Sequence, residues 1–165
     1  MNRILAAGLL YIVASAPACA AYSPLYAGFQ LDNTSGTALL GYQINKTYAV
    51  EVFATGSKTS IDQAGATSDT KITEAGMAAL FMFPMTLTGG SPYLLFAKAG
   101  YARISKKVTY NFPTVSLSGS YSNTENQAIV GAGAQYDFYP SLNGRVGVDI
   151  VDRDRSVYLG IIFRF

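Results

Sequence analysis

Few side chains in this chain of 165 residues are suited to catalysis. The sequence contains no histidine, and its one cysteine is Cys19. Serines are plentiful, but we identify no base that would activate one of them as a nucleophile. Glu51 and Glu74, expected on adjacent strands, form the one carboxylate pair that could do acid–base work. Their simpler interpretation is structural, as carboxylates balanced by nearby cations, so we predict no catalytic residue, no cofactor and no metal site.

The elements that must position these residues are β-strands. From residue 22 onward, apolar side chains recur at every second position, which is the strand period. Turn-forming clusters rich in Gly, Pro, Asn and Ser separate the alternating runs, and no linker or second domain is indicated. We expect about eight strands, near residues 24–32, 37–45, 47–56, 71–83, 92–104, 124–138, 142–151 and 156–165.

The two faces of these strands differ in an informative way. In the last strand, Val157, Leu159 and Ile161 share one face, while Gly160 and Arg164 share the other. The same contrast between a smooth apolar face and a Gly-rich face with scattered charges recurs in the runs at 47–56, 124–138 and 142–151. A soluble barrel would carry a dense polar face, but charged residues make up only 13% of this chain. The pattern favours an apolar face toward lipid and leaves a soluble secreted binding protein as the alternative.

A sheet that lies in a bilayer must close, because unpaired backbone groups in hydrocarbon are costly. The expected fold is therefore all-β: a transmembrane antiparallel up-and-down β-barrel of about eight strands. Helical spans would need roughly 20 consecutive apolar residues, and no segment after residue 21 has such a run. Aromatic residues near strand ends, including Tyr26, Tyr48, Phe83 and Tyr136, are expected in girdles at the two membrane interfaces.

The N-terminus differs from the rest of the chain. A short basic start at Arg3 precedes an apolar run from Ile4 to Ala14, and residues 18–20 have the small-x-small pattern of a cleavage site. We predict that residues 1–20 are a signal peptide, which leaves residues 21–165 as the barrel domain. The alternative is that Cys19 is lipidated rather than removed. The net charge of +2 with no basic run gives no support to nucleic-acid binding.

Several segments resemble the small outer-membrane barrels described as OmpA-like or opacity-type surface proteins. The resemblance is carried by GYQINKTYAVEVF, SPYLLFAKAGYARI, IVGAGAQYDFYPSLNGRVGVDI and YLGIIFRF. It implies a location in the bacterial outer membrane, and the final Phe165 resembles the signal that outer-membrane assembly machinery recognises. Unlike OmpA, this sequence has no peptidoglycan-binding domain after Phe165, so cell-wall tethering is not expected.

The resemblance is specific for architecture but covers adhesins, structural anchors and small pores. With no catalytic residues identified, we expect a non-enzymatic structural or surface-interaction role, adhesin-like in character. A pore or conduit for small solutes is the alternative.

Charged residues on the Gly-rich face are expected inside the lumen. We place Glu51, Lys98 and Asp149 near mid-barrel and predict that Lys98 is held by Glu51, with Asp149 as a further partner. The lumen of an eight-stranded barrel is just wide enough to be filled by side chains, which favours a packed core of ion pairs over a gated conduit. We expect Asp137, Arg145 and Arg164 nearer the periplasmic end. The full predicted network is Glu51, Glu74, Lys98, Asp137, Arg145, Asp149 and Arg164.

The longest connections, near 57–70 and 105–123, are expected to face outward, while shorter ones at 45–47, 84–91 and 139–142 face the periplasm. Residues 106–117 have strand-like content and are expected to extend the fifth and sixth strands as an exposed hairpin. Candidate surface contacts there are Lys106, Lys107, Tyr110 and Phe112. Their partners would be lipopolysaccharide or a host or other extracellular surface ligand. The simpler interpretation is that the lysines keep an exposed loop soluble.

Overall fold

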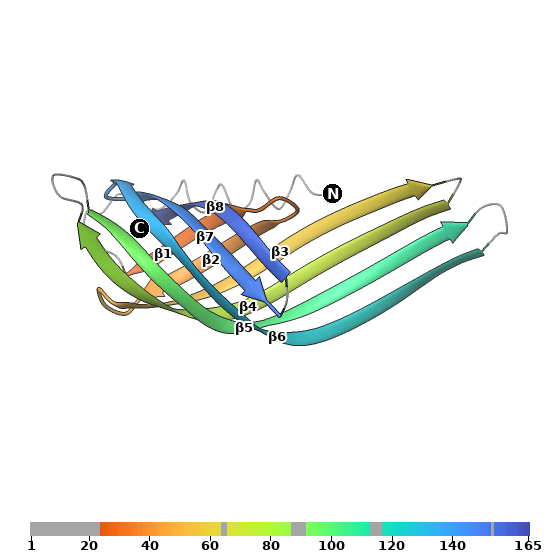
Figure 1. Cartoon of the computed structure of the whole chain (residues 1–165), viewed down its shortest axis with the longest axis horizontal. Helices are drawn as coiled ribbons and strands as arrows, with labels where there is room; N and C mark the ends of the chain where they lie inside the picture. The colour runs from red at the N-terminus through yellow and green to blue at the C-terminus, as the bar shows by residue number, and fades with distance from the viewer. Residues whose placement is uncertain (1–23, 64–65, 87–91, 113–116, 153) are drawn as a thin grey trace.

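A computed structural model of the chain describes residues 24–63, 66–86, 92–112, 117–152 and 154–165. These residues form one closed antiparallel barrel in which each strand pairs with the next and β8 pairs with β1 (Figure 1). The strands are β1 (Leu25–Leu31), β2 (Gly36–Gln43), β3 (Tyr48–Gln63), β4 (Ala66–Thr86), β5 (Pro92–Phe112), β6 (Leu117–Tyr139), β7 (Leu142–Val151) and β8 (Asp154–Arg164). The predicted fold class is confirmed. The predicted signal peptide and Cys19 lie outside the described residues and stay a prediction.

Alternation along each strand separates a packed interior from an apolar exterior. Leu80 and Ile162 are only 1% exposed and belong to the core inside the barrel. On the opposite face, Val52, Met77 and Leu159 are exposed, although their side chains are apolar. The predicted assignment of the two faces is thus confirmed. No helix in the described ranges is long and apolar enough to cross a membrane.

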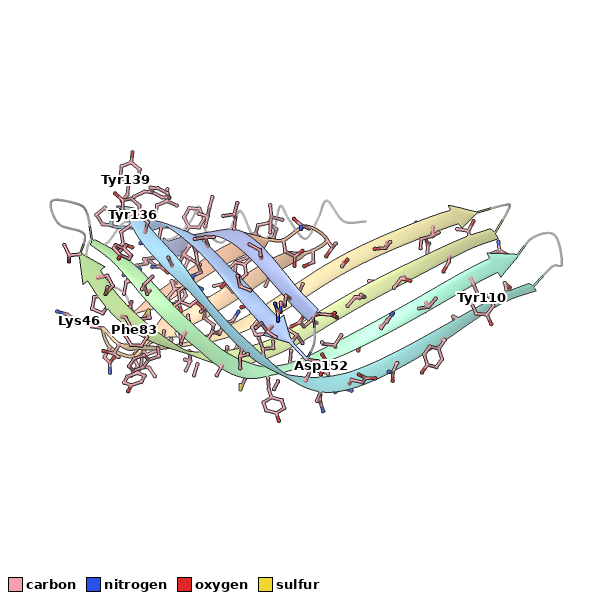
Figure 2. All side chains as sticks on the ribbon, viewed as in Figure 1. Lys46, Phe83, Tyr110, Tyr136, Tyr139 and Asp152 are labelled. Atoms are coloured by element: carbon pink, nitrogen blue, oxygen red, sulfur yellow. The ribbon has the colours of Figure 1, made fainter. Side chains whose placement is uncertain are left out.

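One end of the barrel carries the short turns, and we call it the turn end. There the side chain of Asn45 accepts hydrogen bonds from the backbone N–H groups of Thr47 and Tyr48, each at 2.8 Å. Aromatic rings cluster at this end in edge-to-face pairs, Tyr48–Phe81, Phe81–Phe83 and Tyr136–Phe138, with centroids 5.1, 4.4 and 5.3 Å apart. Figure 2 shows Phe83, Tyr136 and Tyr139 at the same end as Lys46. Tyr26 does not join them: it is buried in the lumen, so its predicted place in a girdle is wrong.

At the opposite end, four strands continue beyond the barrel. β3 has no β2 partner after Gly56, and β6 pairs with β7 only from Ile129 onward. Beyond the row that contains Gly56, β3 to β6 pair only with one another. We call this part, residues 57–63, 66–72, 106–112 and 117–123, the outer sheet. Figure 1 shows it as the long projection of β3 to β6 away from the barrel body.

The outer sheet corrects two predicted connections. The hairpin expected over residues 106–117 is present, but residues 57–63 and 66–70, predicted as part of a loop, are also strand. The sequence does not reveal these strand residues, because Ser, Thr, Lys and Asp dominate both faces of the segment and no apolar alternation marks it. Pairing with the neighbouring hairpin supplies the order that the local pattern does not show.

The barrel closes through its C-terminal residues. β8 pairs with β1 from Tyr26–Arg164 to Leu31–Leu159. The backbone N–H of Phe165 continues this seam by donating to the carbonyl of Leu25 at 3.3 Å. The terminal residue therefore contributes directly to closure of the barrel at the turn end.

Candidate functional site

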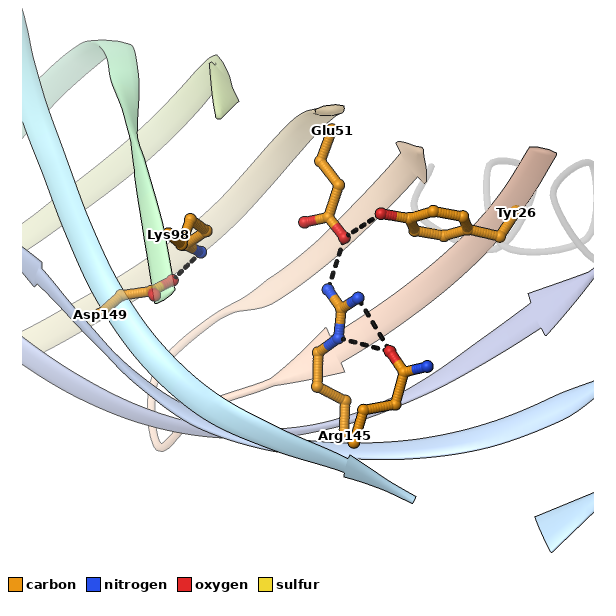
Figure 3. A network of polar contacts seen from close by, with 6 residues as sticks. Tyr26, Glu51, Lys98, Arg145 and Asp149 are labelled. Carbon is orange, nitrogen blue, oxygen red and sulfur yellow. Dashed lines mark hydrogen bonds and ion pairs between the residues drawn. The ribbon is translucent and has the colours of Figure 1, made fainter. Parts of the chain in front are cut away.

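The lumen holds two layers of polar contacts. The lower layer, which is nearer the turn end, is built around Arg145 on β7. Its Nη1 lies 2.6 Å from Oε1 of Glu51 on β3, and its Nη2 donates to Oε1 of Gln135 at 3.1 Å (Figure 3). The hydroxyl of Tyr26 donates to the same Glu51 oxygen at 2.8 Å. The guanidinium carbon also lies 4.9 Å from the ring centre of Phe96. Hydrogen bonds, an ion pair and a ring face together replace the water that a buried cation loses.

The upper layer is built around Lys98 on β5. Its Nζ lies 2.5 Å from Oδ2 of Asp149 and 5.4 and 5.8 Å from the ring centres of Tyr158 and Phe53. In the strand register, Lys98 is opposite Gly131, which in turn is opposite Asp149. A Cβ atom at position 131 would collide with the Asp149 carboxylate. The glycine therefore leaves the space across which lysine and aspartate meet.

The partner of Glu51 differs from the prediction. Glu51 binds Arg145, whereas Lys98 binds Asp149. Glu51 comes three residues after β3 begins at Tyr48, and Arg145 comes three residues after β7 begins at Leu142. Both therefore lie at one level near the turn end. Glu51 therefore lies in the layer of Arg145 and not in that of Lys98, which comes six residues after β5 begins at Pro92.

The remaining residues of the predicted network, Glu74, Asp137 and Arg164, lie at other positions of the barrel. Glu74 is half-buried and lies opposite Thr55, four residues along β3 from Glu51, so the two carboxylates do not form an acid–base pair. Asp137 is exposed at an irregularity near the end of β6, where it accepts a hydrogen bond from Asn143. Asn143 is itself buried, so the Asp137 carboxylate lies at the turn-end mouth of the lumen, and the pairing of β6 with β7 becomes irregular only after Asp137. Arg164 is half-buried at the end of β8.

Above Lys98 the lumen contains a cavity of about 50 Å³. Its lining includes Asp32, Glu74, Asp149, Lys98 and Tyr158. A space of this size accommodates only a few water molecules. Within the described ranges, no group of three or more acidic, histidine or cysteine side chains is arranged to hold a metal ion.

Among the described residues, six buried polar or tyrosine side chains of the lumen were absent from the predicted network. Gln135 and Tyr158 fall on the Gly-rich face that the alternation marks, but only charged residues on that face were selected as candidates. A search for every polar side chain on the face would have found them. The missed residues are Tyr26, Gln30, Gln43, Gln135, Asn143 and Tyr158, each no more than 6% exposed.

The outer sheet divides the predicted surface contacts between its two faces. Lys106 lies on the face that continues the lumen-facing side of β5. Lys107 lies on the opposite face, which continues the lipid-facing side of the barrel. Tyr110 lies opposite Gly119, and a Cβ there would collide with the tyrosine ring, so Tyr110 packs across the neighbouring strand. Figure 2 shows Tyr110 far along the projection. Phe112 ends β5, and its side chain is outside the described set.

Two aspartates on the outer side of the barrel are held in their ionised form. Asp32, in the turn between β1 and β2, accepts from the N–H groups of Thr34 and Ser35 at 2.7 and 2.6 Å and from the Ser35 hydroxyl at 2.6 Å. Partial burial opposes ionisation, but these hydrogen bonds outweigh it and lower the pKa of Asp32. On the outer sheet, the hydroxyl of Ser60 and then Lys58 lower the pKa of Asp69.

Comparisons with known proteins agree with this geometry. Residues 6–160 match the family described as outer membrane protein beta-barrel domain. No curated protein matches the sequence. Among solved structures, the N-terminal β-barrel domain of Pseudomonas aeruginosa OprF is 16% identical, with 86% of this chain and 95% of that chain covered and a TM-score of 0.60.

Two further structures share the fold. Neisserial surface protein A is 17% identical, with 86% of this chain and 94% of that chain covered and a TM-score of 0.59. Ail of Yersinia pestis, solved in complex with the heparin analogue sucrose octasulfate, is 15% identical, with the same shares of both chains covered and a TM-score of 0.56. The outer-membrane location is confirmed, and the alternative of a soluble secreted protein is wrong. The chain belongs to the outer membrane protein beta-barrel domain family.

Proposed function

We propose that this protein is a non-enzymatic outer-membrane barrel whose closed body anchors the outer sheet as a surface for contact with extracellular ligands. The observation that carries the proposal is the continuation of β3 to β6 beyond the barrel as a paired sheet. Strands that only crossed the membrane would not need this additional length. The β3 strand has 16 residues and β6 has 23, whereas about 9–11 residues suffice for a tilted span.

The lumen supports this role better than it supports transport. Arg145 and Glu51 join across the interior and are both at most 4% exposed. A solute that passed between them would have to separate a buried, hydrogen-bonded ion pair, which is costly. The adjacent Lys98–Asp149 pair adds a second obstruction. We therefore favour a structural lumen over the alternative of a small-solute pore.

Catalysis also lacks support from the arrangement of side chains. The chain has no histidine. The two most buried acid–base candidates, Glu51 and Asp149, are occupied by Arg145 and Lys98. A carboxylate held in this way stabilises a cation and is poorly placed to exchange protons with a substrate.

The outer sheet can be removed at positions that the register defines. Ser57 lies opposite Ile72, and Lys106 lies opposite Asn123. Replacing residues 58–71 and 107–122 each by Asn-Gly would join directly opposed residues through a two-residue hairpin turn. The shortened protein should keep the barrel, because the exchanged residues lie beyond its last complete row.

The experiment compares cells that display the full or the shortened protein, with cells carrying an empty vector as reference. Binding is measured to host-cell layers and to immobilised heparin, a probe suggested by the heparin-analogue complex of Ail. We expect the full protein to raise binding above the reference and the shortened one not to do so, at equal amounts of folded barrel. Equal binding by both forms, or no increase with the full protein on either surface, would contradict the proposed function.

A further inference from the structure

We infer that the outward face of the outer sheet binds the phosphate groups of lipopolysaccharide in the outer leaflet, through a row of three lysines. Lys58 on β3 is directly opposite Lys71 on β4, and Lys71 is directly opposite Lys107 on β5. Directly opposed side chains in a sheet have Cβ atoms about 5 Å apart, and like charges at such positions repel one another. An anion placed against the row removes this repulsion.

The row lies at the level where phosphate groups are expected. Its lysines share the outward face with Val52, Met77 and Tyr101, which are directly opposed in a row lower on the barrel and are 49–65% exposed. Lys58 follows Tyr48 of the aromatic cluster at the turn end by ten residues. Ten residues of a strand tilted by about 40° rise roughly 25 Å, which is the height of the apolar band of such barrels. The lysines therefore reach the far membrane interface on the lipid-facing side.

Carboxylates within the outer sheet neutralise only part of this charge. Lys58 lies 3.5 Å from Asp69, whose side chain also accepts a hydrogen bond from Ser60 at 2.5 Å. Among the described residues, no carboxylate lies within ion-pair distance of Lys71 or Lys107. Two adjacent ammonium groups above a lipid-facing surface match a phosphate group in charge and in donor chemistry.

The inference goes beyond the proposed function, because it assigns a lipid partner to the outward face rather than an extracellular ligand to the sheet. Its test uses the full chain, folded in an uncharged detergent, and titrates rough lipopolysaccharide in mixed micelles to obtain an apparent Kd. The variant is Lys71→Gln with Lys107→Gln. The matched control is Lys46→Glu, which lowers the net charge by the same two units at the turn end. Heat-modifiable gel migration checks that each protein is folded.

We expect the Lys71/Lys107 variant to bind lipopolysaccharide at least tenfold more weakly, and the control to stay within twofold of the parent. Lipopolysaccharide stripped of its phosphates should bind the parent as weakly as the intact lipid binds the variant. Unchanged binding by the variant, or an equal loss in the control, would overturn the inference. So would a variant that loses soluble heparin but keeps lipopolysaccharide, since the row would then serve an extracellular polyanion. If the double variant did not fold, the two single variants would be judged by the same criteria.

This outcome is separable from that of the proposed function. Loss of lipopolysaccharide binding with intact binding to host cells would support the lysine row and leave the contact role to the rest of the sheet. Shortening the sheet without any effect on host-cell binding would contradict the contact role without affecting the titration.

Discussion

Arg145 and Glu51 are 94 residues apart in the sequence, yet their side chains meet at 2.6 Å across the lumen. They come from β7 and β3, which are not neighbours in the barrel. The contact therefore links opposite parts of the wall and occupies the interior at the level of the turn end. Tyr26 and Gln135 complete its hydrogen bonding from two further strands.

Breaking this pair should destabilise the barrel. Arg145→Met leaves the Glu51 carboxylate buried without a cation, and we expect the free energy of unfolding to fall by about 3 kcal/mol or more, the scale for breaking a buried ion pair. Adding Glu51→Gln should recover part of this loss, because no uncompensated charge then remains. Denaturant titrations in lipid vesicles would measure the parent, both single variants and the double variant.

The second lumen pair tests whether the two layers are independent. Lys98→Met should be rescued by Asp149→Asn and not by Glu51→Gln, because Lys98 contacts Asp149. The same titrations would show this as a coupling energy in one double-mutant cycle and none in the other. Rescue of Lys98→Met by Glu51→Gln instead would mean that the partners are exchanged relative to the structure.

A lumen closed by two ion pairs should not conduct. We expect planar bilayers that contain the purified protein to show no discrete current steps above the background of the lipid, because each pair would have to open for an ion to pass. The current through the parent is compared with that through the double variant Glu51→Gln with Arg145→Met, in which one of the two ion pairs is replaced by uncharged side chains. Reproducible single-channel currents from the parent protein would restore the small-solute pore as its function.

Sequence alternation predicted most of this barrel, but it could not assign partners within the lumen. The period of two separates Arg145 and Asp149 from Val146 and Val148 without reference to any other strand. Which carboxylate meets Arg145 depends on where each strand begins and on the register between strands. The alternation along one strand carries no information about its register with the other strands, so it cannot identify the partner.

The outer sheet shows a second limit. Where lipid ends, the outward face no longer needs apolar residues, so the alternation that marked β3 up to Ala54 fades while the strand continues to Gln63. Inter-strand hydrogen bonding maintains the structure there. The hairpin at residues 106–117 was predictable because Val108 and Tyr110 retain β-forming side chains on one face.

The outward face offers a direct test of the membrane boundary. Val52→Arg places a charge near the middle of the apolar band and should lower the free energy of unfolding by roughly 2–4 kcal/mol. Ser120→Arg places the same side chain on the same face of the outer sheet, where we expect less than about 0.5 kcal/mol. Unfolding in vesicles of defined lipid would compare the two. Equal costs would place both positions in the same environment and contradict the boundary inferred above.

The turn between β1 and β2 should make stability depend on pH. The folded pKa of Asp32 is lowered by its hydrogen bonds, so its stabilising effect is present above the unfolded value of about 3.9 and is lost as the pH falls through the folded value. Asp32→Ala should lower the free energy of unfolding by about 1–2 kcal/mol at pH 7. The difference from the parent should shrink on acidification below pH 4. A difference that stayed constant or grew would show that the ionised carboxylate is not responsible.

The central claim is that β3 to β6 carry a sheet outside the cell while the short turns face the periplasm, and labelling of single cysteines on intact cells tests it most directly. In a background with Cys19→Ser, we would introduce Ser60→Cys and Ser122→Cys in the outer sheet, Val52→Cys in the apolar band and Lys46→Cys at the turn end. A membrane-impermeant maleimide should label positions 60 and 122 on intact cells, position 46 only after the outer membrane is permeabilised, and position 52 under neither condition. Labelling of position 46 on intact cells, with positions 60 and 122 protected, would contradict the account.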